Sequence, residues 1–423
     1  MIAEKTNTAQ LLIEKISSTA GKVNFINDSA ITKALFYLEE KGIPTNKNEE
    51  YKYCNVDAIL KKEFKNIQNQ FLEVKNSDEF KLEDTITLVV INGNYSETLS
   101  DKIILKGLHI SAFSNSDNNS KQLLTSIADV ESDAFIALNT AFCGNGFHLT
   151  VEKNTVLQIP IHVLYINSAS TDSFVNPRNI IELQESAEAT VIEHYLNIGS
   201  AKVFTNFVSE KFVGENAKLQ SYTIQNEGTN GFGVCTNQVK LNKHSVYNNT
   251  TVTLSGQVVR NNHNVVLADS NCEAHLNGLF ITSGSQLVDN HTMMDHQMPH
   301  CESNELYKGI IDDKSTGVFN GKIFVRRDAQ KTNAYQSSKN ILLSDDATIN
   351  TKPQLEIYAD DVKCSHGTST GKIEEEAMFY LNARGIGKES AKKLLLNAFA
   401  REVIDKIAVD SLRELVNQKL NLI

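Results

Sequence analysis

The chain has 423 residues and a mass of 47.0 kDa, more than one ordinary domain, although a single elongated repeat array could account for much of it. Its formal net charge of -10 and pI of about 5.6 argue against nucleic acid or a membrane surface as the main partner, because both need a basic face. The N-terminal stretch has no signal-peptide apolar region, and no apolar run reaches the roughly 18 residues of a spanning helix, so we expect a cytoplasmic protein. The six cysteines lie far apart without a CxxC pair and are expected to be reduced thiols.

Residues 1–77 are predicted to form an N-terminal helical region, because apolar residues recur there at the spacing of one helix face. A Gly-Ile-Pro sequence at residues 42–44 ends the second helix, and the polar extended segment "TNKNEEYKY" follows. The apolar positions that carry this prediction are Leu11, Leu12, Ile16, Ile31, Leu35, Phe36 and Leu38.

Residues 78–365 follow a different pattern and are predicted to form a parallel β-helix, a β-solenoid, rather than a β-sandwich. Short apolar or alternating runs such as "TITLVVING", "VLQIPIHVLYIN" and "KIFVRR" are separated by Asn, Gly, Ser and Asp, without the long helical patterns of a βαβ fold. Small residues follow polar turns at intervals of roughly 27 to 31 residues, with one longer gap, and this spacing is typical of stacked coils. These small residues are Ala189, Ala217, Ser245, Cys272, Thr316 and Ala347.

Residues 366–423 are predicted to form a C-terminal helical region. Leu396, Phe399, Val403 and Ile407 recur at the spacing of an amphipathic helix, and the glycines of "ARGIGKES" separate this helix from the preceding one. A helical tail of this kind can cap a solenoid, dock a partner, or do both.

The segment "YADDVKCSHGTSTGK", residues 358–372, ends a predicted strand with a sequence that is similar to a phosphate loop. The Walker pattern needs four residues between its first Gly and the Gly-Lys pair, and then a Ser or Thr. Only three residues separate Gly367 from Gly371, and Ile373 follows Lys372. We therefore predict no nucleotide site on this chain.

Cys364 and His366 are two residues apart, so on a strand both side chains would point to the same face. A thiolate and an imidazole together suit iron, zinc or part of an iron–sulfur cluster. Two ligands do not complete such a site, and the others would come from distant coils or from another subunit. A structural thiol beside a surface histidine is the simpler interpretation, and composition alone leaves both open.

A second group of metal-capable residues lies in "NHTMMDHQMPHCESNELYKG", residues 290–309, within the longer gap of the repeat. His296, His300 and Cys301, with His291 and Asp295, make a mononuclear metal site one hypothesis for this segment. The alternative is a polar bulge between coils. Cys272 occupies a small-residue position of the repeat, so we interpret it as an inward packing residue.

Three pairs of neighbouring carboxylates fall at predicted turns, where solvated Asp residues are common. Polysaccharide-active β-helix enzymes also use Asp pairs, so an enzyme of that class is an alternative function. The absence of Trp disfavours it, since sugar clefts often stack on indole. The pairs are Asp312-Asp313, Asp345-Asp346 and Asp360-Asp361.

Several segments together resemble the SufB/SufD family of iron–sulfur cluster assembly proteins. The most specific one is "NTKPQLEIYADDVKCSHG", and "GIPTNKNEEYKY" and "LNTAFCGNGFHLTV" also fit. The similarity spans most of the chain and is densest from about Gly278 to the C-terminal helices. The sequence from Cys364 to Gly367 is more similar to the SufD branch than to the SufB branch, which usually has His-Glu-Ala there.

This resemblance implies a right-handed parallel β-helix between two helical regions, and a non-enzymatic scaffold subunit in a SufBC2D-type complex. A SufB-type paralogue would pair through the last coils, and an ABC-type ATPase of the SufC type would dock on the C-terminal helices; a homodimer is possible without them. The resemblance places iron or a transient iron–sulfur cluster, shared with the SufB-type partner, at His366 and Cys364. It also implies a role in iron acquisition and cluster transfer. A SufB-like cluster carrier acting alone is a third alternative.

Overall fold

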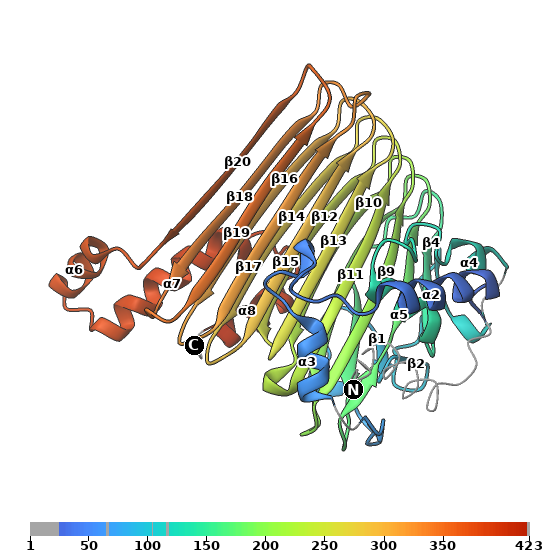
Figure 1. The fold of residues 1–423 in the computed structure, drawn as a ribbon, viewed down its shortest axis with the longest axis horizontal. Helices are drawn as coiled ribbons and strands as arrows, with labels where there is room; N and C mark the ends of the chain where they lie inside the picture. The colour runs from blue at the N-terminus through green and yellow to red at the C-terminus, as the bar shows by residue number, and fades with distance from the viewer. Residues whose placement is uncertain (1–24, 65–66, 104, 116–117, 421–423) are drawn as a thin grey trace, which may run out of the picture.

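The core of the molecule is a β-solenoid, seen in the computed structural model as parallel strands stacked side by side (Figure 1). The structure describes residues 25–64, 67–103, 105–115 and 118–420. The predicted helix positions Leu11, Leu12 and Ile16 lie outside these described residues.

Two ten-stranded sheets form opposite walls of the solenoid. From β8 onward consecutive strands alternate between the walls, so each coil adds one strand to each, and neighbouring strands within a wall are parallel. In the first wall, successive strands from β10 onward begin 27 to 31 residues apart. The prediction of a β-solenoid core flanked by helices is therefore confirmed.

In each wall, the strands are named here in the order in which they lie side by side. The first wall contains β2 (Asn94–Ser96), β1 (Ile86–Ile91), β5 (Ile161–Asn167), β8 (Glu188–Asn197), β10 (Lys218–Asn226), β12 (Val246–Ser255), β14 (Glu273–Thr282), β16 (Glu302–Ile311), β18 (Asn333–Leu342) and β20 (Lys363–Gly371). The second wall contains β19 (Thr348–Ile357), β17 (Thr316–Val325), β15 (Leu287–His296), β13 (Val258–Leu267), β11 (Gly231–Leu241), β9 (Val203–Val213), β7 (Arg178–Leu183), β4 (Gly146–Val151) and β3 (Leu108–Ala112), with β6 (Ser173–Val175) paired to β9.

Residues 290–309 belong to this regular array. They cover most of β15, one turn and most of β16, so the sequence-based interpretation of the segment as a polar bulge is wrong. The longer gap in the repeat also disappears, because Cys301 lies directly before β16 in the place that Cys272 holds before β14. Thr316 and Ala347 belong instead to the second wall.

One corner of the solenoid is built from a column of stacked small residues, which we call the corner ladder. Each member directly precedes a strand of the first wall, and the members stack because those strands pair in register. Three members donate a side-chain hydrogen bond to the carbonyl three residues earlier: Ser245 Oγ to Asn242 O (2.5 Å), Cys272 Sγ to Asp269 O (3.1 Å) and Thr332 Oγ1 to Ala329 O (2.9 Å). The corner ladder consists of Ala187, Ala217, Ser245, Cys272, Cys301 and Thr332.

The helices near the N-terminus cover the outer face of the second wall at its first coils. The α2 helix (Asp28–Lys41) begins at Asn27, whose side chain accepts a hydrogen bond from Ser29 N, and it packs against α5. The α3 helix lies on the same wall, where Phe64 contacts Phe204 and Phe232 edge-on. The remaining elements of this part are η1 (Glu49–Tyr51), α3 (Val56–Glu63), η2 (Asp78–Phe80), η3 (Phe113–Asn115), α4 (Asn118–Leu123), α5 (Ala134–Phe142) and η4 (Gly228–Asn230).

The C-terminal helices differ in how they contact the solenoid. Both α7 (Lys388–Ile404) and α8 (Asp410–Leu420) pack on the outer face of the first wall, burying Val403 and Val416 against a cluster that includes Ile192. The α6 helix (Glu375–Ala383) has no buried residue and stands away from the strands (Figure 1). Among the described helices, none is both long and apolar enough to cross a membrane.

Because of a buried histidine beneath α8, we expect the folded chain to lose stability in acid. His194 on β8 is 3% exposed, neither of its ring nitrogens has a hydrogen-bond partner among the described residues, and burial with Lys419 nearby lowers its pKa to about 4. The folded state therefore binds fewer protons than the unfolded state, and stability falls as the pH drops from about 6.5 towards 4.

We expect the substitution His194→Leu to remove this proton-linked loss. At pH 5, one such histidine lowers the free energy of unfolding by about 2 kcal/mol relative to neutral pH. Urea unfolding at pH 7.5 and pH 5 measures it, with His109→Leu as an exposed control. An equal pH dependence in His194→Leu and in the unsubstituted chain would contradict the prediction.

Candidate functional site

The last strand of the first wall carries the two predicted ligands. β20 pairs in parallel with β18 and is the final strand in its sheet order, so its other edge has no neighbouring strand among the described residues. Cys364 aligns with Ala334, and His366 aligns with Gln336. Both side chains therefore lie on one face of β20, as the spacing of two predicts.

The shared face of these two residues is the interior face of the solenoid. Cys364 is partly buried and packs against the interior core cluster, which includes Ala334. Burial raises the pKa of the Cys364 thiol. His366 is exposed, because no strand beyond β20 covers it among the described residues. A soft thiol sulfur and an imidazole nitrogen thus lie on the same face of an edge strand, a combination that suits iron.

A buried polar row leads from the interior to His366. Gln336 aligns with His366 on one side and with Glu305 on the other. Glu305 Oε2 accepts hydrogen bonds from Gln336 Nε2 (2.9 Å) and Thr292 Oγ1 (2.7 Å), and burial raises the pKa of Glu305 to about 7. The second oxygen of Glu305 and the amide oxygen of Gln336 have no hydrogen-bond partner among the described residues. The row therefore places a carboxyl group with a raised pKa two strands away from His366 in the first wall.

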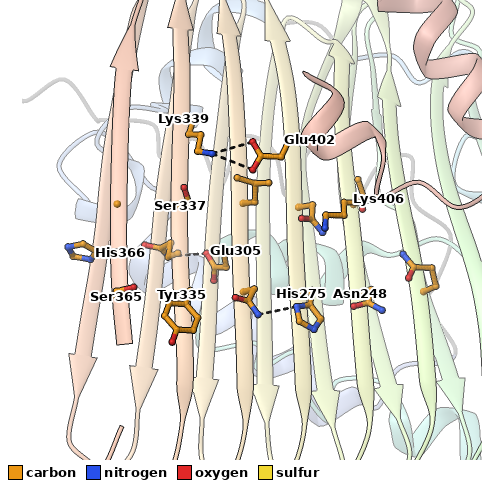
Figure 2. Close-up of a pocket in the computed structure, with 17 residues that line it drawn as sticks. Asn248, His275, Glu305, Tyr335, Ser337, Lys339, Ser365, His366, Glu402 and Lys406 are labelled. Carbon is orange, nitrogen blue, oxygen red and sulfur yellow. Dashed lines mark hydrogen bonds and ion pairs between the residues drawn. The ribbon is translucent and has the colours of Figure 1, made fainter. Parts of the chain in front are cut away.

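An open groove of about 930 Å³ lies on the outer face of the same wall (Figure 2). One of its sides is a row of polar side chains that stack across strands, each aligned with the next. The groove extends under α7, where Glu402 bonds Lys339, and reaches β20 at Ser365 and His366. The stacked row is Gln220, Asn248, His275, Asn304, Tyr335 and Ser365.

The sequence analysis missed this groove. Its stacked row takes one outward polar side chain from each of six strands. The available signal was the recurrence of Asn, His and Tyr one coil apart, which becomes visible only when the coil lengths fix the register.

The other predicted metal residues lie at separate places. His296, at the end of β15, is buried and shares a hydrogen bond with Ser303 Oγ (2.9 Å), and burial lowers its pKa to about 4. His300 lies in the exposed turn before β16 with a φ of 62°, and Cys301 occupies the corner ladder. Across the described ranges, no three His, Cys, Asp or Glu side chains converge in a way that could hold a metal ion.

The segment that is similar to a phosphate loop is mostly extended strand. Gly367 and Gly371 both lie within β20, and Lys372 Nζ bonds Asp345 Oδ1 (2.6 Å). A phosphate-binding loop instead wraps backbone N–H groups around the ligand at a helix N-terminus.

A long parallel solenoid, with helices packed on its walls and two candidate ligand residues on its last strand, defines the class of β-helix proteins. The chain belongs to the SufB/SufD family of iron–sulfur cluster assembly proteins. The family model for the SufBD core domain of the SUF iron–sulfur cluster assembly system matches residues 165–399, and the model for the SufBD N-terminal region matches residues 11–163.

Similar proteins come from several bacteria. The chain is 31% identical over 383 residues to the iron–sulfur cluster assembly protein SufD of Escherichia coli, covering 90% of this chain and 89% of that protein. An iron–sulfur cluster assembly SufBD family protein of Synechocystis is 31% identical over 391 residues, which cover 89% of this chain and 86% of that protein. SufD of Bacillus subtilis is 25% identical over 329 residues, which cover 75% of this chain and 74% of that protein.

Proposed function

We propose that this chain is a non-enzymatic scaffold subunit of a SufBC2D-type complex, and that it pairs with a SufB-type paralogue through its last coil. The observation that carries the proposal is the position of Cys364 and His366 on β20, at an edge where no further strand follows among the described residues. A second solenoid placed against this end would add ligands next to these two. The nascent cluster, or its iron, is the cargo held there and passed on.

The end coil has the properties of an interface. The edges of β19 and β20 present backbone donors and acceptors without strand partners among the described residues, and such edges readily pair with another chain. Tyr358 is 60% exposed beside them, and Ile357 and Tyr335 are also exposed. Aromatic and aliphatic side chains grouped around an open edge favour docking of a second protein. A second copy of this chain could use the same end when the paralogue is absent.

The C-terminal helices support docking of a SufC-type ATPase, which would bring the nucleotide site. Glu402 on α7 pairs with Lys308 on β16 (2.5 Å) and with Lys339 on β18 (3.2 Å), and Lys308 Nζ also bonds Phe399 O (2.8 Å). A pull on α7 would therefore reach the two strands that precede β20 in the first wall. For ATP binding to drive such a pull, the ATPase must bind nucleotide with different affinity in its open and closed states.

The test of the proposed function uses the spectrum of an iron–sulfur cluster. The chain is purified without oxygen, alone and after co-expression with a SufB-type paralogue and the ATPase, and iron, sulfide and visible absorption are measured. We expect a cluster spectrum from the complex and little from the chain alone. A full cluster on the isolated chain would support a lone carrier instead, and a complex that never forms would refute the scaffold role.

Point substitutions on α6 test the docking site. Phe379 is 75% exposed and Tyr380 56% exposed, so replacing both with Ser should leave the fold intact and weaken ATPase capture about tenfold or more. Phe36→Ser is the matched control, because Phe36 is 62% exposed on α2 at the other end of the solenoid. Deletion of the whole tail is a poorer test, because it would also uncover the apolar wall beneath α7 and α8. Pull-down or calorimetric titration gives the affinities, and unchanged capture by the double variant would exclude α6 as the docking helix.

A further inference from the structure

Two cysteines of the corner ladder lie next to each other in neighbouring coils. Cys272 precedes β14 and Cys301 precedes β16, and these strands pair in register from their first residues. Glu302 N donates to Cys272 O (2.9 Å), which holds the two coils together at the position of the cysteines. Adjacent parallel strands are about 4.8 Å apart, within the Cα separation that a disulfide can span.

The two sulfur atoms converge on one backbone oxygen. Cys272 Sγ lies 3.1 Å from Asp269 O, and Cys301 Sγ lies 3.2 Å from the same atom. The two thiols also interact, since each shifts the pKa of the other. The other four cysteines, Cys54, Cys143, Cys235 and Cys364, are likewise free thiols. Among the described residues, no other cysteine shifts the pKa of any of these four, in contrast to Cys272 and Cys301.

We propose that Cys272 and Cys301 form a reversible disulfide that links two neighbouring coils of the solenoid when the chain meets a hydroperoxide. The pair would be a modification site distinct from Cys364 and His366, because β14 and β16 lie three and two strands before β20 in the first wall. The proposal does not depend on the proposed scaffold function.

The two thiols are inequivalent, which favours an ordered reaction. The hydrogen bond from Cys301 lowers the pKa of Cys272, and the same contact together with burial raises the pKa of Cys301. The Cys272 thiolate attacks one peroxide oxygen, the O–O bond breaks, and Cys272 becomes a sulfenic acid as water leaves. The Cys301 sulfur then attacks the sulfenic sulfur, loses its proton and expels a second water. Two thiols and one hydrogen peroxide thus give one disulfide and two waters.

Access to the sulfur atoms is controlled by the turns beside them. Both cysteines are at most 1% exposed, but each follows directly on an exposed turn residue, Asn271 or His300. Local opening of a turn is far less costly than opening a coil. We therefore expect the oxidation to be slow and to go to completion in excess peroxide.

Alkylation counting with intact-mass measurement tests the proposal. The full-length chain is treated with hydrogen peroxide, quenched, denatured and alkylated with N-ethylmaleimide. The reduced chain takes up six groups, one for each of its six cysteines. We expect the oxidised chain to take up two fewer, a cross-linked peptide to join Cys272 to Cys301, and a phosphine reductant to restore the full count.

Serine variants are the matched controls. Cys272→Ser and Cys301→Ser keep a donor at the corner, as the native Ser245 does one coil earlier, so both should fold. After peroxide treatment, neither variant should take up two fewer alkyl groups than its own reduced form, whereas Cys235→Ser should still take up two fewer. An unchanged count in the peroxide-treated chain, a cross-link between other cysteines, or oxidation of Cys272 to sulfinic acid while Cys301 stays free would each overturn the proposal.

Discussion

Replacing Arg178 with Met is expected to destabilise the chain by about 3–5 kcal/mol, because it leaves a buried carboxylate without its cation. Arg178 and Glu210 are fully buried, with Nη2 and Oε1 2.6 Å apart. Arg178 also donates to Asn139 Oδ1 and Thr140 Oγ1 on α5. One guanidinium therefore joins two strands of the second wall to the helix that covers them.

Glu210 extends this connection to the segment before α5. Its two oxygens accept hydrogen bonds from the backbone N–H groups of Thr125 (2.9 Å), Ile127 (3.2 Å) and Ala128 (3.1 Å). The Arg178→Met chain keeps these three bonds but has a buried charge with no countercharge, so the segment before α5 should open first. Native-state hydrogen exchange at residues 125–142 should show the largest loss of protection.

Urea unfolding followed by tyrosine fluorescence measures the loss, because the chain contains no Trp. The control is Lys153→Met, since the Lys153–Glu185 pair has the same 2.6 Å separation but is about half exposed and should contribute less than about 1 kcal/mol. Adding Glu210→Gln to Arg178→Met should recover part of the lost stability, because it removes the unpaired charge. Equal losses for Arg178→Met and Lys153→Met would show that burial does not set the strength of this pair.

The coil repeat could be predicted from the sequence because the corners of a solenoid admit only small side chains. Ala217, Ser245 and Cys272 were found on this basis and do stack in the corner ladder. Cys301 was missed because the histidines just before it suggested metal binding. The structure shows that His296 is a buried residue bonded to Ser303, a role that no spacing of ligand types could have distinguished.

The amphipathic pattern of the tail was also visible, but not the surface that it covers. Leu396, Phe399, Val403 and Ile407 pack on the chain's own first wall, whose outer face is apolar around Tyr222. Those wall residues are one or two outward side chains on each of several strands, so no local pattern shows that they form one surface. The exposed aromatic residues of α6 could be located only once α7 and α8 were seen to occupy that wall.

At the open end, a strand period of two was enough to place Cys364 and His366 on one face. The row from Glu305 through Gln336 to His366 was not predictable, because its register depends on coils that differ in length by a residue. A sequence pattern fixes neighbours along a strand, whereas neighbours between coils depend on every intervening turn.

The double substitution Cys364→Ser, His366→Ala is expected to lower the iron and sulfide content of the assembled complex severely while leaving the solenoid folded. Both residues lie on the last strand, and Cys364 is only partly buried, so their removal takes little from the core. Loss of one ligand from a shared site should cost roughly 10- to 100-fold in metal affinity, by analogy with the loss of a supporting partner. His366→Ala alone should have the larger effect, because ligands from the partner can supply much of the thiolate.

Iron and sulfide per complex give the result, with circular dichroism and the elution volume confirming fold and assembly. Ser365→Ala is the matched control, because Ser365 lies between Cys364 and His366 but faces the outer groove with Tyr335. If Ser365→Ala lowers the content as much as the double variant, the effect comes from the strand edge and not from ligation. If the double variant assembles with unchanged iron and sulfide, the cargo is held elsewhere.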